Sequence, residues 1–145
     1  MTMHAPRIGI TMGDPAGVGP EITVKALAVP EVGASCRAVV VGSGDALAAA
    51  IDLLRAPVTL RRVKTVEDCR YALGTVECLD LANVDMASLP RGAVSPEAGR
   101  AAYANIETAV GLCQPRAIDG IVTAPINKEA LPAAGHQHTG HTEIL

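Results

Sequence analysis

The sequence predicts a layered α/β fold, in which a mostly parallel sheet is flanked by helices. Short runs rich in Val and Ile alternate with helical stretches along the chain, as they do in strand–helix–strand units. One run, Arg37–Gly42, is apolar on both faces, which favours a strand inside a parallel sheet. Hydrophobic residues make up 49% of the 145 residues, but Tyr71 and Tyr103 are the only aromatic side chains apart from histidine. We therefore expect an aliphatic core.

The first part of the chain predicts a strand, a loop and a helix. The strand is expected at Arg7–Thr11, and a glycine-rich loop at Met12–Gly19 connects it to a helix at Pro20–Leu27. Proline suits the first turn of a helix, because the N–H that it lacks would have no partner there. Pro30 is expected to close this segment.

The strand at Arg37–Gly42 is expected to lead into a second helix and then into further strands. Apolar residues at helical spacing predict a helix at Ala46–Leu54, with Ser43 or Asp45 as its cap. Val58–Val63 and Thr75–Leu81 alternate apolar and polar residues. This alternation indicates strands near an edge of the sheet, or strands with one face in water.

The last part of the chain continues the alternation of helices and strands. A cap, a proline and an acid follow one another at Ser95-Pro96-Glu97, which is typical of a helix start. We expect a loop at Asn83–Ala93, a helix from Ser95 to Cys113, a strand at Asp119–Thr123, a short helix at Lys128–Ala134 and the first turn of a helix at Thr142–Leu145.

Charge and composition exclude several function classes. Twelve Lys and Arg residues against fifteen Asp and Glu residues give a net charge of −3, so we expect no partner among nucleic acids or anionic membranes. No apolar run approaches the roughly 18–20 residues that span a bilayer, and the start of the chain lacks the apolar core of a signal peptide. The four cysteines form no CxxC pair. These features indicate a cytoplasmic protein with reduced thiols.

The glycine-rich loop is the first candidate site. Gly13, Gly17 and Gly19 let the backbone approach a ligand or another chain segment closely. Backbone amides between a strand and a helix can hold an anion. The spacing, however, fits neither of the common phosphate-binding patterns, GxxxxGK[ST] and GxGxxG. Contact with a ligand and a purely structural tight turn are both compatible with this loop.

A second candidate site lies near the C-terminus. His136, His138 and His141 are close together there, flanked by glycines, and could form a zinc site, contact a substrate or lie in a solvated loop. Lys128 follows the strand expected at Asp119–Thr123, at the edge of the sheet where α/β folds bind ligands. Its ammonium is either a candidate contact for a phosphate or carboxylate, or simply an exposed charge.

Two segments together resemble the signatures of a known enzyme family. Ile10–Glu21, which reads Ile-Thr-Met-Gly-Asp-Pro-Ala-Gly-Val-Gly-Pro-Glu, is similar to the N-terminal signature of the 4-hydroxythreonine-4-phosphate dehydrogenase family. Val122–Lys128, followed by Thr139–Glu143, resembles the second signature of that family, in the same order and at the same separation. The family includes relatives that act on 4-phospho-threonate or 4-phospho-erythronate.

The resemblance implies an NAD-dependent and metal-dependent dehydrogenase. Such an enzyme oxidises the secondary alcohol of 4-phosphooxy-L-threonine, and the resulting β-keto acid loses carbon dioxide, during the biosynthesis of pyridoxal 5'-phosphate (vitamin B6). A divalent metal, Zn, Mg or Co, holds the developing enolate charge. The implied subunit has two α/β lobes like those of isopropylmalate and isocitrate dehydrogenases, and it forms a homodimer.

The resemblance also assigns candidate site residues. The substrate-binding His-Thr pair of the family falls on His141 and Thr142, which implies contacts with a small phosphorylated hydroxy acid. Lys128 stays a candidate anion contact, whereas His136 and His138 match no family position, which weakens the zinc alternative. The metal ligands and most NAD contacts are expected beyond residue 145, so no catalytic, metal or cofactor residue is assigned within the chain.

On this interpretation, residues 1–145 form the N-terminal lobe of a larger enzyme, with the second lobe missing and no activity of the lobe alone. Within the enzyme class, the alternatives are a dehydrogenase of 4-phospho-D-threonate or 4-phospho-D-erythronate and a dehydrogenase of an aromatic cis-dihydrodiol. From another class, the alternative is a small module that binds a phosphorylated metabolite without catalysis. An unrelated α/β domain with chance motifs is the remaining interpretation.

Overall fold

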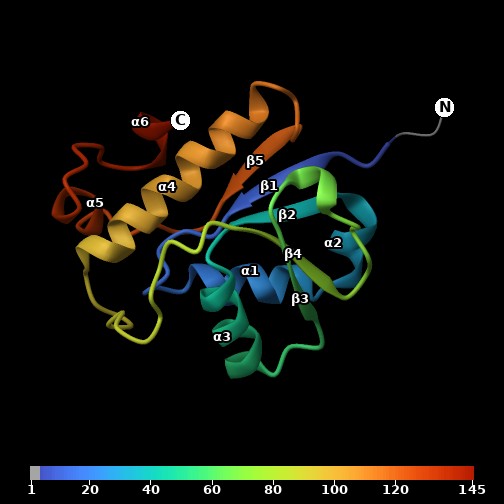
Figure 1. Cartoon of the computed structure of the whole chain (residues 1–145), viewed down its shortest axis with the longest axis horizontal. Coiled ribbons are helices and arrows are strands. Elements are labelled where there is room, and N and C mark those ends of the chain that lie inside the picture. The colour runs from blue at the N-terminus through green and yellow to red at the C-terminus, as the bar shows by residue number, and fades with distance from the viewer. Residues whose placement is uncertain (1–3) are drawn as a thin grey trace.

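The computed structural model describes residues 4–145, which form one five-stranded sheet with helices on both faces (Figure 1). All strand pairs are parallel, in the order β3-β4-β2-β1-β5. The strands are β1 (Arg7–Thr11), β2 (Arg37–Gly42), β3 (Thr59–Val63), β4 (Thr75–Asp80) and β5 (Gly120–Thr123). This architecture confirms the predicted fold class, a layered α/β fold with a parallel sheet.

Helices cover the two faces of the sheet unequally. They are α1 (Gly19–Leu27), α2 (Pro30–Ser35), α3 (Gly44–Leu54), α4 (Pro96–Cys113), α5 (Ala130–Ala133) and α6 (His141–Ile144). Val40 of β2 packs in one core cluster with side chains of α1 and α3. Its neighbour Val41 points to the opposite face and packs in a second cluster with α4. Both clusters are aliphatic, as the composition predicts.

The starts of the two longest helices follow from local sequence. The hydroxyl of Ser43 accepts a hydrogen bond from the amide of Ala46 at 3.2 Å and caps α3. Ser95 does the same for the amide of Ala98 at 3.1 Å, at the start of α4. Each cap satisfies a backbone donor that the first helical turn leaves without an intrahelical partner. Of the two caps considered for α3, the structure uses Ser43.

Three local expectations are wrong or incomplete. Pro30 does not simply close a segment, because it begins the short helix α2. The strand β4 does not lie at an edge or face water, since it sits between β3 and β2 and its residues Val76–Leu79 are buried. A single 3₁₀ turn at Val66–Asp68, which no pattern predicted, connects β3 to β4. The predicted short helix near the C-terminus is confirmed as α5, with fewer residues than expected.

The strand order directs attention to the carboxyl ends of β1 and β5. β1 lies between β2 and β5. The chain first adds β2, β3 and β4 on one side of β1 and later returns to add β5 on the other side. The loop after β1 leads to α1 on one face, whereas the segment after β5 leads to α5, which packs on α4 at the other face (Figure 1). Open α/β sheets bind ligands at the carboxyl edge, at the point where the chain takes opposite directions from neighbouring strands.

Candidate functional site

The loops after β1 and β5 meet at this carboxyl edge. The amide of Asp14 donates a hydrogen bond to the carbonyl oxygen of Pro125 at 3.0 Å, and the amide of Ala124 donates to the carbonyl oxygen of Thr11 at 3.0 Å. Gly13 has a φ of +78°, and a Cβ at this position would collide with the carbonyl oxygen of Pro125. Gly13 therefore allows the close approach to another chain segment that the glycines of this loop predict, because any other residue would separate the two loops.

Asp14 gives the glycine-rich loop an internal polar contact. The residue is 4% exposed, and one carboxylate oxygen accepts a hydrogen bond from the amide of Ala16 at 2.7 Å. Burial raises the pKa of Asp14 above its ordinary value, although hydrogen bonds from the amides of Ala16 and Gly17 oppose this rise. A carboxylate in this position weakens the loop as a site for an anion. Ligand contact by the loop stays a prediction.

Lys128, His141 and Thr142 line one open hollow of about 540 Å³ beside the Pro125–Ile126 segment. Lys128 follows β5, whereas His141 and Thr142 begin α6, so the structure brings together the three residues singled out in the sequence. Within residues 4–145, Lys128 takes part in no ion pair. The Nε2 atom of His141 is buried without a hydrogen-bond partner in the same part of the chain.

The carboxylate of Glu143 also lines the hollow, but it is already engaged. One oxygen accepts a hydrogen bond from the amide of Thr139 at 2.7 Å, and the other accepts from the Thr139 hydroxyl at 2.8 Å. These two hydrogen bonds lower the pKa of Glu143. The residues that line the hollow therefore carry an ammonium, an imidazole and a hydroxyl, a set that suits an anionic, oxygen-rich ligand.

The three clustered histidines do not converge on one point. The ring of His136 stacks on Tyr103 of α4, with centroids 3.8 Å apart and planes 10° apart. His138 lies against the same ring at 5.6 Å. Within residues 4–145, no three His, Cys, Asp or Glu side chains form a group that could hold a metal ion. The solvated-loop alternative is wrong for His136, which is half-buried on α4, and local geometry gives the zinc alternative no support.

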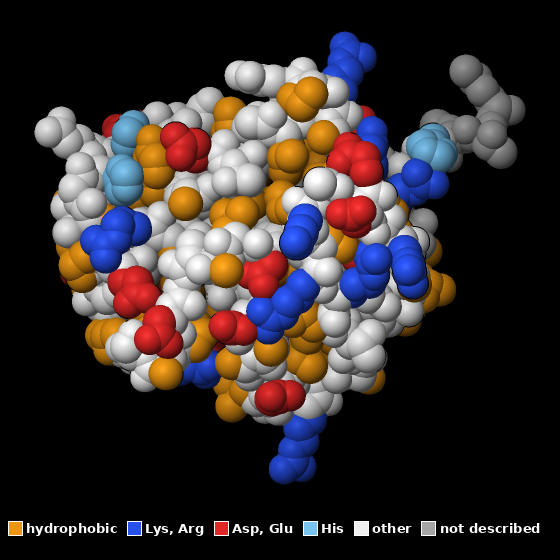
Figure 2. Space-filling model, in the orientation of Figure 1, with side chains coloured by type: hydrophobic (Ala, Val, Ile, Leu, Met, Phe, Trp, Pro, Cys, Tyr) orange, Lys and Arg blue, Asp and Glu red, His pale blue; other side chains and the backbone are white. Residues whose placement is uncertain are grey.

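Histidine side chains lie over the region of α5 and α6, as Figure 2 shows. On the rest of this face, Lys and Arg side chains are interspersed with Asp and Glu side chains (Figure 2). No broad basic surface appears on the face in view, in keeping with the net charge of −3. Recognition of an anion at the carboxyl edge must therefore depend on a few individual side chains and not on a broad basic surface.

A second, smaller hollow lies on the other side of Pro125–Ile126. The loops at Asp14–Val18 and Gly92–Ala93 line it together with Asn127, and its volume is about 290 Å³. The amide of Gly92 donates to the carbonyl oxygen of Ala16 at 2.7 Å, which holds the two loops together. The sequence offered no signal for this pairing, because the segment around Gly92 has neither a periodic pattern nor a recognisable motif.

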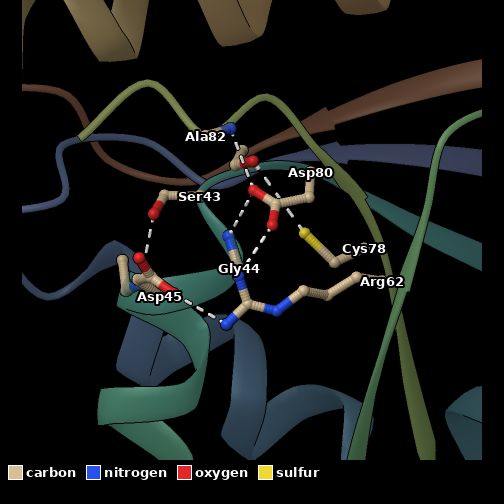
Figure 3. Close-up of polar contacts among 9 residues, drawn as sticks. Ser43, Gly44, Asp45, Arg62, Cys78, Asp80 and Ala82 are labelled. Carbon is tan, nitrogen blue, oxygen red and sulfur yellow. Dashed lines mark hydrogen bonds and ion pairs between the residues drawn. The ribbon is translucent and has the colours of Figure 1, made fainter. Parts of the chain in front are cut away.

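A polar cluster at the carboxyl end of β4 was also missed from the sequence (Figure 3). Asp80 accepts hydrogen bonds from the amides of Gly44 and Ala82, both at 2.9 Å, and from Arg62 at 2.8 Å. Arg62 also pairs with Asp45 at 2.7 Å. Burial opposes ionisation of Asp80, but the amides and Arg62 outweigh it and hold its pKa below the ordinary value. The N-terminus of α3 is thus satisfied by the protein's own carboxylate, and the cluster is structural.

Comparison with known proteins identifies relatives of this chain. The family described as pyridoxal phosphate biosynthetic protein PdxA matches residues 34–145. The chain is 47% identical over 145 residues to D-threonate 4-phosphate dehydrogenase from Cupriavidus necator, a match that covers 100% of the chain and 43% of the relative. No helix in the described part of the chain has the length and apolarity to span a membrane.

Two solved structures of enzymes with a related name superpose closely on this chain. A 4-hydroxythreonine-4-phosphate dehydrogenase from Burkholderia phymatum superposes with a TM-score of 0.95 at 47% identity, over 99% of this chain and 43% of that chain. The enzyme of the same name from Klebsiella pneumoniae superposes with a TM-score of 0.90 at 38% identity. This match covers 99% of this chain and 44% of the K. pneumoniae chain. The chain therefore spans less than half the length of these relatives.

Proposed function

The chain belongs to the pyridoxal phosphate biosynthetic protein PdxA family, and from this premise we propose that its protein oxidises the secondary alcohol of a phosphorylated hydroxy acid. The observation that carries the proposal is the convergence of Lys128, His141 and Thr142 on one hollow at the carboxyl edge of the sheet. Because the chain spans 43% of its relative from C. necator, catalysis is proposed for the whole protein and substrate binding for this chain.

D-threonate 4-phosphate is the first candidate substrate, and 4-phosphooxy-L-threonine, in pyridoxal 5'-phosphate biosynthesis, is the second. The two acids differ in that the first carries a hydroxyl beside its carboxylate and the second carries an ammonium. The match with D-threonate 4-phosphate dehydrogenase from C. necator, at 47% identity over 145 residues, supports placing the hydroxy acid first.

The proposed role of the chain is to bind and orient this substrate. The Lys128 ammonium pairs with the phosphate or the carboxylate, since no other ion pair within the described residues occupies it. His141 Nε2 forms a hydrogen bond with a substrate oxygen, which would satisfy an atom that is buried without a partner. Thr142 adds a hydroxyl beside it. Groups fixed on two elements hold the alcohol in one orientation for oxidation.

Oxidation of an alcohol requires a hydride acceptor, and we propose NAD for that role. We also propose a divalent cation, Zn, Mg or Co, which would stabilise the enolate formed when the β-keto acid loses carbon dioxide. Residues 4–145 do not fit a metal site, because no three of their His, Cys, Asp or Glu side chains group suitably. The ligands are therefore proposed to lie elsewhere in the protein.

A chimera tests the proposed activity. In it, this chain replaces the matched 43% of the C. necator relative, and NADH formation is followed with D-threonate 4-phosphate, D-erythronate 4-phosphate, 4-phosphooxy-L-threonine and an aromatic cis-dihydrodiol. We expect oxidation of D-threonate 4-phosphate by the chimera and none by the chain alone. Binding without turnover by the chimera would instead favour a non-catalytic module, and turnover of the dihydrodiol alone would refute a phosphorylated substrate.

A further inference from the structure

We propose that Tyr103 is a positioning residue, which holds His141 and Thr142 in place through its stack with His136. This inference rests on the proposed function, because it concerns the residues assigned there to substrate binding. Tyr103 itself does not line the hollow, so it acts through the loop between α5 and α6.

The stack is the first contact. The rings of Tyr103 and His136 are nearly parallel, with planes 10° apart and centroids 3.8 Å apart. His138 lies against the same tyrosine ring at 5.6 Å and 36°. The chain has two tyrosines and no phenylalanine or tryptophan, so aromatic packing of this kind is rare within it. One of its two tyrosines is thus placed against two histidines of one loop.

The helix that carries Tyr103 is a firm support for the loop. α4 has 18 residues, and Gly99 lies one turn before Tyr103 on the same side of the helix. A Cβ on Gly99 would collide with the carbonyl oxygen of Ala130, so α5 packs directly on the backbone of α4 there. Ala130 and Leu131 are 1% and 0% exposed. The side of α4 that holds α5 therefore also holds the loop that follows α5.

The loop passes this constraint on to the hollow over a short stretch of chain. Thr139 and Gly140 are the only residues between His138 and His141, and the two hydrogen bonds from Thr139 to Glu143 fix the start of α6. Nδ1 of His138 and Nε2 of His141 are both buried without a hydrogen-bond partner in the described chain. No hydrogen bond at these two nitrogens fixes the loop, so its packing on Tyr103 through His136 and His138 is what holds it next to α6.

Two variants of Tyr103 separate the stack from the hydroxyl. Tyr103→Phe keeps the ring and its stack, whereas Tyr103→Leu keeps a shorter apolar side chain and removes the stack. Stacked aromatic pairs contribute enough that their loss weakens a dependent interaction about three- to tenfold. We expect Tyr103→Leu to weaken binding of D-threonate 4-phosphate by this factor, and Tyr103→Phe to bind like the wild type.

The first test needs no ligand. In the 145-residue chain labelled with ¹³C-histidine, the stack places the ring protons of His136 over the tyrosine face, which shifts their NMR signals upfield. Tyr103→Phe should keep that shift. Tyr103→Leu should abolish it and should also move the signals of His141, while those of His4 stay unchanged. Thermal unfolding of the same samples reports whether each variant remains folded.

Calorimetric titration of the same three proteins with D-threonate 4-phosphate completes the test. Weaker binding by Tyr103→Leu alone, together with moved His141 signals, supports the proposal. Unmoved His141 signals with unchanged affinity in a folded Tyr103→Leu variant overturn it, as does an equal loss of affinity in Tyr103→Phe. If the wild type fails to bind the acid while Tyr103→Leu still moves the His141 signals, positioning of the loop is supported and the substrate-binding role proposed for this chain is refuted.

Discussion

The amide of Asp14 and the carbonyl oxygen of Pro125 form a hydrogen bond of 3.0 Å, which joins the loops at the carboxyl ends of β1 and β5. This bond brings the glycine-rich segment of the first signature into contact with the second signature. Pro125 separates the two hollows at this edge, one next to Asp14 and the other next to Lys128. The shape of the candidate site therefore depends on how closely these two loops approach.

Gly13→Ala should disrupt that approach. The residue has a φ of +78°, and its new Cβ would collide with the carbonyl oxygen of Pro125. The left-handed backbone costs a non-glycine residue about 1–2 kcal/mol, and with the collision we expect a loss of about 3 kcal/mol in the free energy of unfolding, measured by urea denaturation. Gly74→Ala is the matched control, because Gly74 has a φ of +74° with nothing within 4 Å of a Cβ. Equal losses in both variants would show that the close approach is unimportant.

Glu77→Gln should destabilise the sheet strongly. The side chain of Glu77 is 0% exposed, and it accepts hydrogen bonds from Arg61 at 3.1 Å and from the amides of Arg70 and Tyr71. The substitution leaves Arg61, which is 30% exposed, without its buried partner and weakens the acceptor for two amides, so we expect a loss of about 2 kcal/mol in the free energy of unfolding. Asp45→Asn, which removes an ion pair with a largely exposed aspartate, should cost less than about 1 kcal/mol. A loss that small for Glu77→Gln would contradict the role given to this pair.

Asp80→Asn should reduce stability at neutral pH but not in acid. The pKa of Asp80 is lower in the folded chain than its ordinary value of 3.8, so its ionised form stabilises the fold above that value. This contribution is lost as the pH falls through the folded pKa. We expect Asp80→Asn to unfold more easily than the wild type by about 2 kcal/mol near pH 7, with the difference shrinking towards about pH 3. Thermal unfolding across that range would contradict this account if the difference stayed constant.

Asp14→Asn should show the opposite dependence on pH. Burial raises the pKa of Asp14, so the folded chain holds this proton more tightly than the unfolded chain does. Its contribution to stability is complete below 3.8 and is lost as the pH rises through the folded pKa. Asn keeps an oxygen for the amide of Ala16 and does not ionise. The melting temperature of Asp14→Asn relative to wild type should therefore rise from about pH 3 to about pH 7, and a relative fall would contradict the assignment.

Much of the fold could be predicted, because its signals are local. The strand at Arg7–Thr11 has the predicted bounds, and so does the one at Arg37–Gly42, since apolar runs of this length suit a buried parallel sheet. The caps Ser43 and Ser95 act within three residues of themselves. In β4 the alternation of apolar and polar residues was misleading, because a glutamate at position 77 is typical of a strand face in contact with water. The structure instead buries this carboxylate against Arg61, a partner on the neighbouring strand that the spacing within β4 could not reveal.

The candidate site was predictable in part for the same reason. Lys128, His141 and Thr142 were found from short motifs, and the sheet topology places them at one edge. The stack of Tyr103 on His136 was not predicted, because it joins a helix to a loop far along the chain. A single sequence shows which residues are present in each segment, but the contact between these segments depends on how α4 packs across the sheet.

Binding of a phosphorylated hydroxy acid at the hollow is the central prediction for this chain. Calorimetric titration of the 145-residue chain with D-threonate 4-phosphate should therefore be compared with that of Lys128→Met and His141→Ala. Charge-assisted hydrogen bonds are each worth about 1.5–3 kcal/mol, so each variant should bind at least about tenfold more weakly. Lys64→Met, which removes an exposed lysine outside the residues that line the hollow, should bind like the wild type. Wild-type affinity in both Lys128→Met and His141→Ala would contradict the account.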